Sequence, residues 1–343
     1  MSTSRLKGSA LSSVRWPGRW ASMIGLAMVA SACTEILDAG HSRPHELLPV
    51  DERNPVILYQ DDWSGDWLGE YAVLFANSGG PPLAGIVVNA SKIWTNLNIN
   101  ASGWNDLVAA ARSSGLKGIP DVTASAGAPL VRPADGLIDS TAPNHSAGAQ
   151  LIVDVSRGLS TPERPVVVVA ATSLTDIADA YLVDPTVIDR VVVVAALGSF
   201  AAPNGIMGGP NGDMDPWSDW IVTQRFRYVQ VSSYYDQTGD VTSAQLPSLP
   251  QNALGTRIAN KRPNIISVNT ASDQVALLAV ALSTFAVAVQ RASPDVAAGF
   301  DSTQGPPLAP AVSGPSWLVT QIDAPVAAAR LWQMLEDPHT FGL

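Results

Sequence analysis

The chain has 343 residues, 46% of them hydrophobic and 15% charged, and this composition is too apolar for a disordered protein. Its 20 basic and 30 acidic residues give a net charge of −10, so a nucleic acid backbone would be repelled and no nucleic acid partner is expected. A single cysteine excludes a disulfide framework and a cysteine-based zinc site.

The first 32 residues have the pattern of a secretory signal peptide. They contain four basic residues and no acidic one, and an apolar run from Trp20 to Ala30 leads to small residues before Cys33. The run is too short for a permanent membrane span. A cysteine after small residues resembles a bacterial lipobox, although Ala30 stands where leucine is usual. This pattern predicts a lipid on Cys33 that anchors the secreted protein to the membrane of the bacterial cell envelope, in the periplasm or at the cell surface. The alternative is a plain signal peptide with an incidental cysteine.

Residues 33–54 are expected to form a tether and residues 55–343 a single α/β domain. Short apolar runs, often β-branched, predict strands at 56–59, 83–88, 166–171, 191–196, 226–232 and 265–268. Helices are predicted near 67–77, 103–114, 146–158, 174–182, 216–225 and 273–291, with a last helix at 325–336. Because strands and helices alternate, the expected fold is a doubly wound, mostly parallel sheet with helices on both faces.

Polar residues that follow the strands are the candidate site residues, because doubly wound sheets bind ligands beyond the carboxyl ends of their strands. The first strand is followed by Asp61, Asp62 and Asp66, whose mutual repulsion favours a ligand or metal role over helix capping alone. The glycine-rich loop 198–216 is either functional or a plain surface loop. After the strand at 265–268, Asp273 is either an N-cap or a ligand.

The order and spacing of these segments resemble the inosine-uridine nucleoside hydrolase family over about residues 55–290. Leu174–Ala178 is similar to the family's Leu-Thr-Asn-x-Ala turn, with Asp in place of Asn. Asn211 and Asp215 keep the family's spacing of Asn, three residues and Asp-Pro. Ser272–Ala276 is similar to a His-Asp-Pro-x-Ala helix start. The order of these matches along the chain carries the resemblance.

The resemblance implies hydrolysis of the N-glycosidic bond of purine or pyrimidine ribonucleosides by a water bound to one Ca²⁺ ion. It implies that Asp62 is both metal ligand and general base, and that the Ala171 carbonyl and Asp273 also bind the ion. Asp66 is expected to bind the ribose hydroxyls through its carboxylate. The further substrate-binding candidates are Asn211, Asp215 and Ser272. The expected partner is a nucleoside or another riboside, and a homo-oligomer is left open.

The chain departs from the family pattern at two places that matter for the chemistry. Gln60 and Trp67 replace two of four aspartates in the opening signature Asp-x-Asp-Pro-x-x-Asp-Asp, so calcium binding is expected to be weak. Asp61 or Glu70 could supply the lost ligand. Ser272 replaces a histidine that often protonates the leaving group. The alternatives are therefore a catalytically degenerate relative that binds a nucleoside or polyol, and an unrelated lipid-anchored α/β binding protein.

Overall fold

The computed structural model describes residues 48–62, 68–196, 211–231, 247–261, 286–303, 305–337 and 339–340. The chain divides into two compact units, Met1–Ser42 and Arg43–Leu343, and every described residue belongs to the second. The predicted signal peptide and the strand at 265–268 lie outside the described residues. So do four predicted functional residues: Cys33, Asp66, Ser272 and Asp273.

Nine strands of the described chain form one sheet, in the order β3-β2-β1-β4-β5-β6-β9-β7-β8. They are β1 (Val56–Gln60), β2 (Leu83–Asn89), β3 (Val122–Ser125), β4 (Val166–Ala171), β5 (Val191–Ala196), β6 (Arg227–Val231), β7 (Ala286–Pro294), β8 (Leu308–Pro310) and β9 (Ser316–Ile322). Neighbouring strands are parallel, except that β7 runs antiparallel to β8 and β9. The predicted doubly wound, mostly parallel sheet is thus confirmed.

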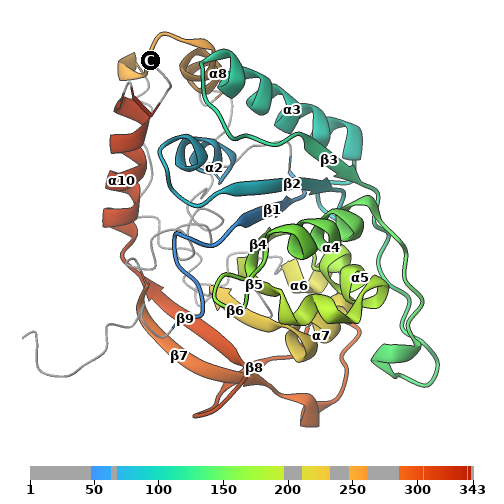
Figure 1. The fold of residues 1–343 in the computed structure, drawn as a ribbon. Helices are drawn as coiled ribbons and strands as arrows, with labels where there is room; N and C mark the ends of the chain where they lie inside the picture. Colours follow the sequence, from blue (N-terminus) through green and yellow to red (C-terminus); the bar gives the residue numbers. More distant parts are fainter. Residues whose placement is uncertain are drawn as a thin grey trace, which may run out of the picture. The chain divides into compact units, whose positions relative to one another are not determined.

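Helices cover both faces of the sheet (Figure 1). One face carries α2 (Leu68–Asn77), α3 (Leu97–Ser113), α8 (Ala253–Lys261) and α10 (Ala324–Glu336), and the other carries α4 (Ala147–Leu159), α5 (Thr175–Val183) and α7 (Pro216–Arg225). The short α6 (Asn211–Met214) precedes α7, and 3₁₀ helices lie at Ile138–Ser140, Pro185–Asp189 and Val296–Ala298. Successive strand residues point to opposite faces, so Leu58 and Val169 enter one core while Ile57 and Val168 enter the other.

Several segments differ from the sequence-based expectation, because β3, β7, β8, β9 and α8 were not predicted at their places. The helix predicted at 273–291 is wrong over its last residues, because they belong to β7, which pairs with β9. A continuous apolar run does not distinguish a buried helix from a strand, and here a partner strand further along the chain decides. Leu48 and Val50, inside the predicted tether, are buried in the core, so packing of the domain begins before Pro55.

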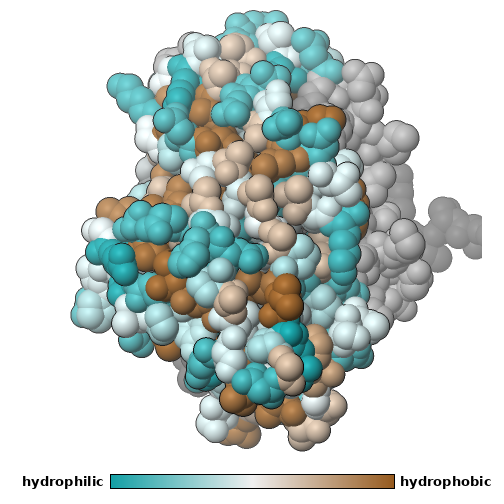
Figure 2. Space-filling view, turned by 90° about the vertical axis from the view of Figure 1, so that its right-hand side faces the viewer, coloured by the Kyte–Doolittle hydropathy of each residue, from teal (hydrophilic) through white to brown (hydrophobic). Residues whose placement is uncertain are grey.

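None of the helices in the described segments has the length and hydropathy of a membrane span. Figure 2 shows one face of the molecule, on which small apolar areas are separated by polar ones. Such mixing is the ordinary composition of a protein surface.

Candidate functional site

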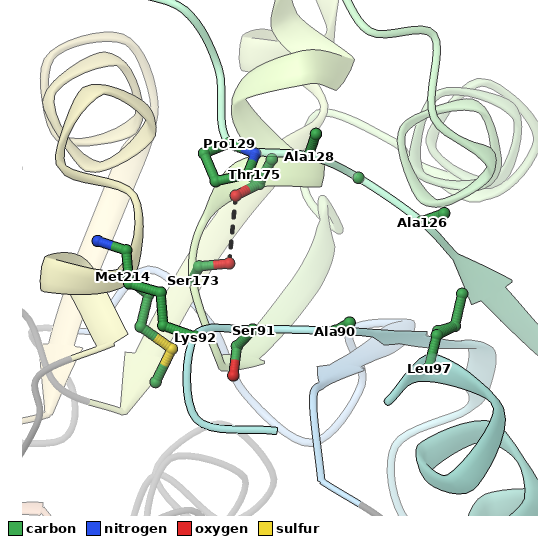
Figure 3. A pocket seen from close by; sticks show the side chains of 11 residues that line it. Ala90, Ser91, Lys92, Leu97, Ala126, Ala128, Pro129, Ser173, Thr175 and Met214 are labelled. Carbon is green, nitrogen blue, oxygen red and sulfur yellow. Dashed lines mark hydrogen bonds between the residues drawn. The ribbon is translucent and has the colours of Figure 1, made fainter. Parts of the chain in front are cut away.

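The carboxyl ends of β2, β3 and β4 surround a cavity of about 330 Å³ (Figure 3). Its wall is formed by Ala90, Ser91 and Lys92 after β2, Ala126, Gly127, Ala128 and Pro129 after β3, Ser173 and Thr175 after β4, Leu97 of α3 and Met214 of α6. The cavity lies where the strand order reverses, since β2 and β3 extend from one side of β1, and β4, β5 and β6 from the other. Ligand sites of doubly wound folds occur at this switch point, and the volume is at the small end of the usual range.

A buried hydrogen-bond network joins the strand ends around this cavity. Asn89, the last residue of β2, donates from Nδ2 to the Tyr59 hydroxyl at 2.7 Å and accepts from Thr172 Oγ1 at 3.1 Å. The hydroxyls of Ser173 and Thr175 lie 3.2 Å apart and form part of the wall (Figure 3). All five side chains are buried. Because these groups hold one another in place, the polar part of the wall is preformed.

Asp215 connects three of the segments that build the site. Its carboxylate accepts from Thr175 Oγ1 at 2.8 Å and from the Leu130 backbone N–H at 3.0 Å. Asp215 is also the N-cap of α7, and its carboxylate accepts from the Ser218 N–H at 3.2 Å and from the Ser218 hydroxyl. Asp215 does not line the cavity. The structure therefore gives it a positioning role behind Thr175, and its contact with a substrate stays a prediction.

The predicted base Asp62 and the predicted ligand Ala171 lie at the same edge of the sheet. Gln60 of β1 is opposite Ala171 of β4 in the parallel register, and Asp62 follows two residues later. The Asp62 carbonyl accepts from Trp104 Nε1 at 3.0 Å, and the Asp61 N–H donates to Gln60 Oε1 at 2.9 Å. Asp61 and Asp62 are 3% and 7% exposed, and neither lines the cavity. Two adjacent carboxyl groups are thus enclosed next to the end of β4.

The described residues do not by themselves form a calcium site. Ca²⁺ binds six to eight oxygen atoms, and no group of three or more His, Cys, Asp or Glu side chains suited to a metal occurs in the described ranges. Glu70, the suggested replacement for the lost ligand, is engaged by a basic side chain, and its role as a metal ligand stays a prediction. The Glu70 carboxylate is fully buried and forms an ion pair with Arg257, with 3.0 Å between Oε1 and the guanidinium.

The short helix α6 places the predicted sugar ligand Asn211 near the cavity. Asn211 is the first residue of this helix and is buried, while Met214 of the same helix forms part of the cavity wall. Lys92 Nζ donates to the Asp213 carbonyl at 3.0 Å and so joins α6 to the end of β2. Contact between Asn211 and a sugar remains a prediction.

Two residues of this region, Asn89 and Asp176, were not predicted as site residues. Asn89 ends a valine-rich strand with an amide, which is the signal that could have revealed it. Asp176 carries the one change in the Leu174–Ala178 turn from the family pattern. Burial raises the pKa of Asp176 to about 6, an effect opposed by the hydroxyls of Ser125 and Ser146. Neither Asp176 carboxyl oxygen makes a hydrogen bond of regular geometry within the described structure.

This architecture is that of the nucleoside hydrolases, which confirms the resemblance at the level of the fold. An inosine-guanosine nucleoside hydrolase superposes with a TM-score of 0.63 at 15% identity, covering 82% of this chain and 99% of that one. The inosine-uridine preferring nucleoside hydrolase of Bacillus anthracis gives 0.56 at 13% identity, over 81% of this chain and 99% of that one. The type III effector protein XopQ, solved with adenosine diphosphate ribose, gives 0.52 at 13% identity, over 91% and 99%. No protein-family model and no curated protein sequence matches the chain.

Proposed function

We propose that this protein binds a riboside at the carboxyl edge of its sheet and hydrolyses the N-glycosidic bond. The observation that carries the proposal is the preformed polar cavity at the switch point of a nucleoside hydrolase fold. Two proteins of similar fold are named as nucleoside hydrolases, and a third was solved with adenosine diphosphate ribose. Ribonucleosides and adenosine diphosphate ribose both contain ribose. A small molecule with a ribosyl group is therefore the expected ligand class.

The wall of the cavity has the hydrogen-bonding groups that a sugar requires. Ser91, Ser173 and Thr175 each contribute a hydroxyl, which can donate and accept, as the hydroxyls of ribose can. The side chains of Leu97 and Met214 supply apolar surface in the same cavity. This combination of a few fixed polar groups with apolar contact is typical of small-molecule sites.

Hydrolysis adds water across the bond between the anomeric carbon and the base nitrogen. In the proposal, Asp62 takes a proton from the attacking water while the water oxygen bonds to the anomeric carbon. The leaving nucleobase departs with the electrons of the broken bond and must gain a proton. Ser272 is a poor acid near neutral pH, so a substrate whose leaving group needs no protonation should react faster.

The proposal includes one bound Ca²⁺ ion, with Asp62, the Ala171 carbonyl and Asp273 as its ligands. Asp62 and Ala171 lie at the same edge of the sheet, because Gln60 of β1 is opposite Ala171 of β4 in the parallel register. Trp67 stands where the family has a further aspartate, so the affinity for calcium should be low.

The second candidate function is binding of a nucleoside or polyol without turnover. It is favoured by the ion pair between Glu70 and Arg257. This pair engages the carboxylate that was suggested to replace the aspartate missing at Trp67. The cavity and its hydroxyl groups serve this function equally well.

Turnover and binding assays distinguish the two candidates. We expect the purified protein to release nitrophenol from a nitrophenyl riboside faster than it releases a base from inosine or uridine. Isothermal titration with the same ribosides measures binding. Binding without turnover would establish the second candidate function, and absence of both would contradict the proposed ligand class.

We also propose that a lipid on Cys33 holds the protein at the bacterial cell envelope. The support is the basic, apolar and small-residue pattern before the cysteine. In cell fractionation, wild type should sediment with membranes and the Cys33→Ser variant should be released from them. Equal distribution of both variants would favour the plain signal peptide.

A further inference from the structure

The Asp176 carboxyl is packed between two glycines that come from different segments. Gly127 belongs to the cavity wall after β3, and Gly148 lies in the first turn of α4. A Cβ atom built on Gly127 would overlap Asp176 Oδ1, and one built on Gly148 would overlap Oδ2. The side chain is fully buried. Asp176 is therefore in direct contact with the back of the cavity wall.

No basic side chain of the described segments forms an ion pair with this carboxyl. From β1 it faces the hydroxyl of Tyr59, whose pKa burial raises well above 10, so that this group is neutral. The carboxylates of Asp179 and Asp215 lie in the same region. Ser125 and Ser146 contribute only hydroxyls. From β2, Val87 lies against Gly148, and Asn89 donates to the Tyr59 hydroxyl. Within the described segments, no Lys, Arg or His forms an ion pair with any of the three carboxylates.

We infer that Asp176 is a positioning residue for the cavity wall, which it holds in place when its carboxyl is neutral and loosens when the carboxyl is ionised. A neutral carboxyl can donate its proton to a neighbouring hydroxyl and tolerates close contact with the glycines. An ionised carboxyl in the same place is desolvated and repelled by Asp179, so it gains by admitting water.

The contact with Gly127 is the one that can open at low cost. Gly148 lies in a helix, and its N–H donates to Ser125 Oγ at 3.1 Å. The wall is anchored at Ala128, whose carbonyl accepts from Asn144 Nδ2 at 2.6 Å, and at Leu130 through Asp215. The expected loosening is therefore local to residues 126 and 127, beside the anchored part of the wall.

Hydrogen exchange of the wall tests the inference without any ligand. Exchange of peptides over 122–130 is measured at about pH 5 and about pH 7.5 and corrected for the intrinsic rate. The pKa of Asp176, about 6, lies one unit above the lower pH of the experiment. Protection in the wild type should therefore fall about tenfold at the higher pH, at a factor of ten per pKa unit. Asp176→Asn keeps the shape without the charge and should remove the change.

Two further variants keep the test decisive. Asp106→Asn changes an exposed carboxyl on α3 and should retain the wild-type change in protection. Gly127→Ala places a methyl group against Asp176 and should lower protection at both pH values. Equal protection of the wild type at the two pH values, or an unchanged pH dependence in Asp176→Asn, would overturn the inference.

A second measurement connects the wall to the ligand and rests on the proposed function. The affinity for the nitrophenyl riboside, measured by titration, should weaken in the wild type between about pH 5 and about pH 7.5 and stay constant in Asp176→Asn. A pH-independent wild-type affinity would overturn the positioning role. Absence of riboside binding in all variants at both pH values would instead count against the proposed function, while the exchange result stands by itself.

Discussion

Buried aspartates near the carboxyl edge of the sheet differ in what surrounds them. The Asp179 carboxylate accepts from the backbone N–H groups of Asn144, His145 and Ser146, at 2.7, 3.2 and 2.8 Å, and from the Ser146 hydroxyl. This bonding explains why His145, an exposed residue, has a φ of 53°, because the turn directs three successive N–H groups at one carboxylate. Asp179 thus stabilises the start of α4, whereas the described part of the chain offers Asp176 no comparable set of donors.

At the residue scale, we expect Asp62→Asn to lower riboside turnover by about 10²- to 10⁴-fold, the usual contribution of a general base. The amide keeps the size of the side chain and an oxygen atom but cannot take a proton from water. Rates of nitrophenyl riboside hydrolysis measure the effect, and circular dichroism checks that the fold is retained. Wild-type turnover in the variant would exclude Asp62 as the base.

Asp176→Asn should also stabilise the protein above about pH 6. The pKa of Asp176 is raised from 3.8 to about 6 by burial, so the folded state binds a proton that the unfolded state has released between these values. Stability of the wild type therefore falls as pH rises through this window, by about 3 kcal/mol at 1.4 kcal/mol per pKa unit, and the penalty remains at higher pH. Urea unfolding of both proteins across this window measures the difference. A stability gap that does not change with pH would contradict the expectation.

At the element scale, the ion pair of Glu70 with Arg257 connects helices that are far apart in the sequence. Glu70 is in the first turn of α2, and Arg257 is in the middle of α8. The guanidinium also donates to the Gly103 carbonyl of α3 at 3.0 Å. One side chain of α8 therefore contacts α2 and α3 on the same face of the sheet.

We expect Arg257→Met to lower the free energy of unfolding by about 3 to 5 kcal/mol, because the Glu70 carboxylate would stay buried without its guanidinium. The double variant Glu70→Gln/Arg257→Met should lose less free energy of unfolding than Arg257→Met alone, because it also removes the buried negative charge. Chemical denaturation of the three proteins provides the comparison. A single variant as stable as the wild type would show that water reaches Glu70.

At the scale of the whole molecule, calcium should raise the melting temperature relative to chelator. An ion that binds only the folded state stabilises it by mass action, by about 2.7 kcal/mol when its concentration is one hundred times Kd. The Asp62→Asn variant should show a smaller shift, and Trp67→Asp a larger one if it restores a ligand. Coincident melting curves with calcium and with chelator would remove the ion from the proposal.

The class of fold was predictable from the sequence because its signals are local. The valine-rich strands β4 and β5, and the helices between them, are recognisable from short windows of residues. The place of the site followed from the same reasoning, since polar residues after parallel strands come together at one edge. The roles of Asp62 and Ala171 came from the family resemblance, and the register of β1 with β4 places both residues at that edge.

What required the tertiary structure depends on partners that are remote in the chain. Residues 286–291, the last of the run predicted as a helix, belong to β7 because β9 pairs with them. The Glu70 carboxylate forms an ion pair with Arg257, which lies 187 residues away in the sequence. Asp176 resembles a helix-start residue in sequence, but its burial depends on Gly127 and Gly148, where a side chain would overlap its carboxyl. Local patterns specify which residues form strands and helices, whereas the charge state and the contacts of a buried group depend on what folding brings against it.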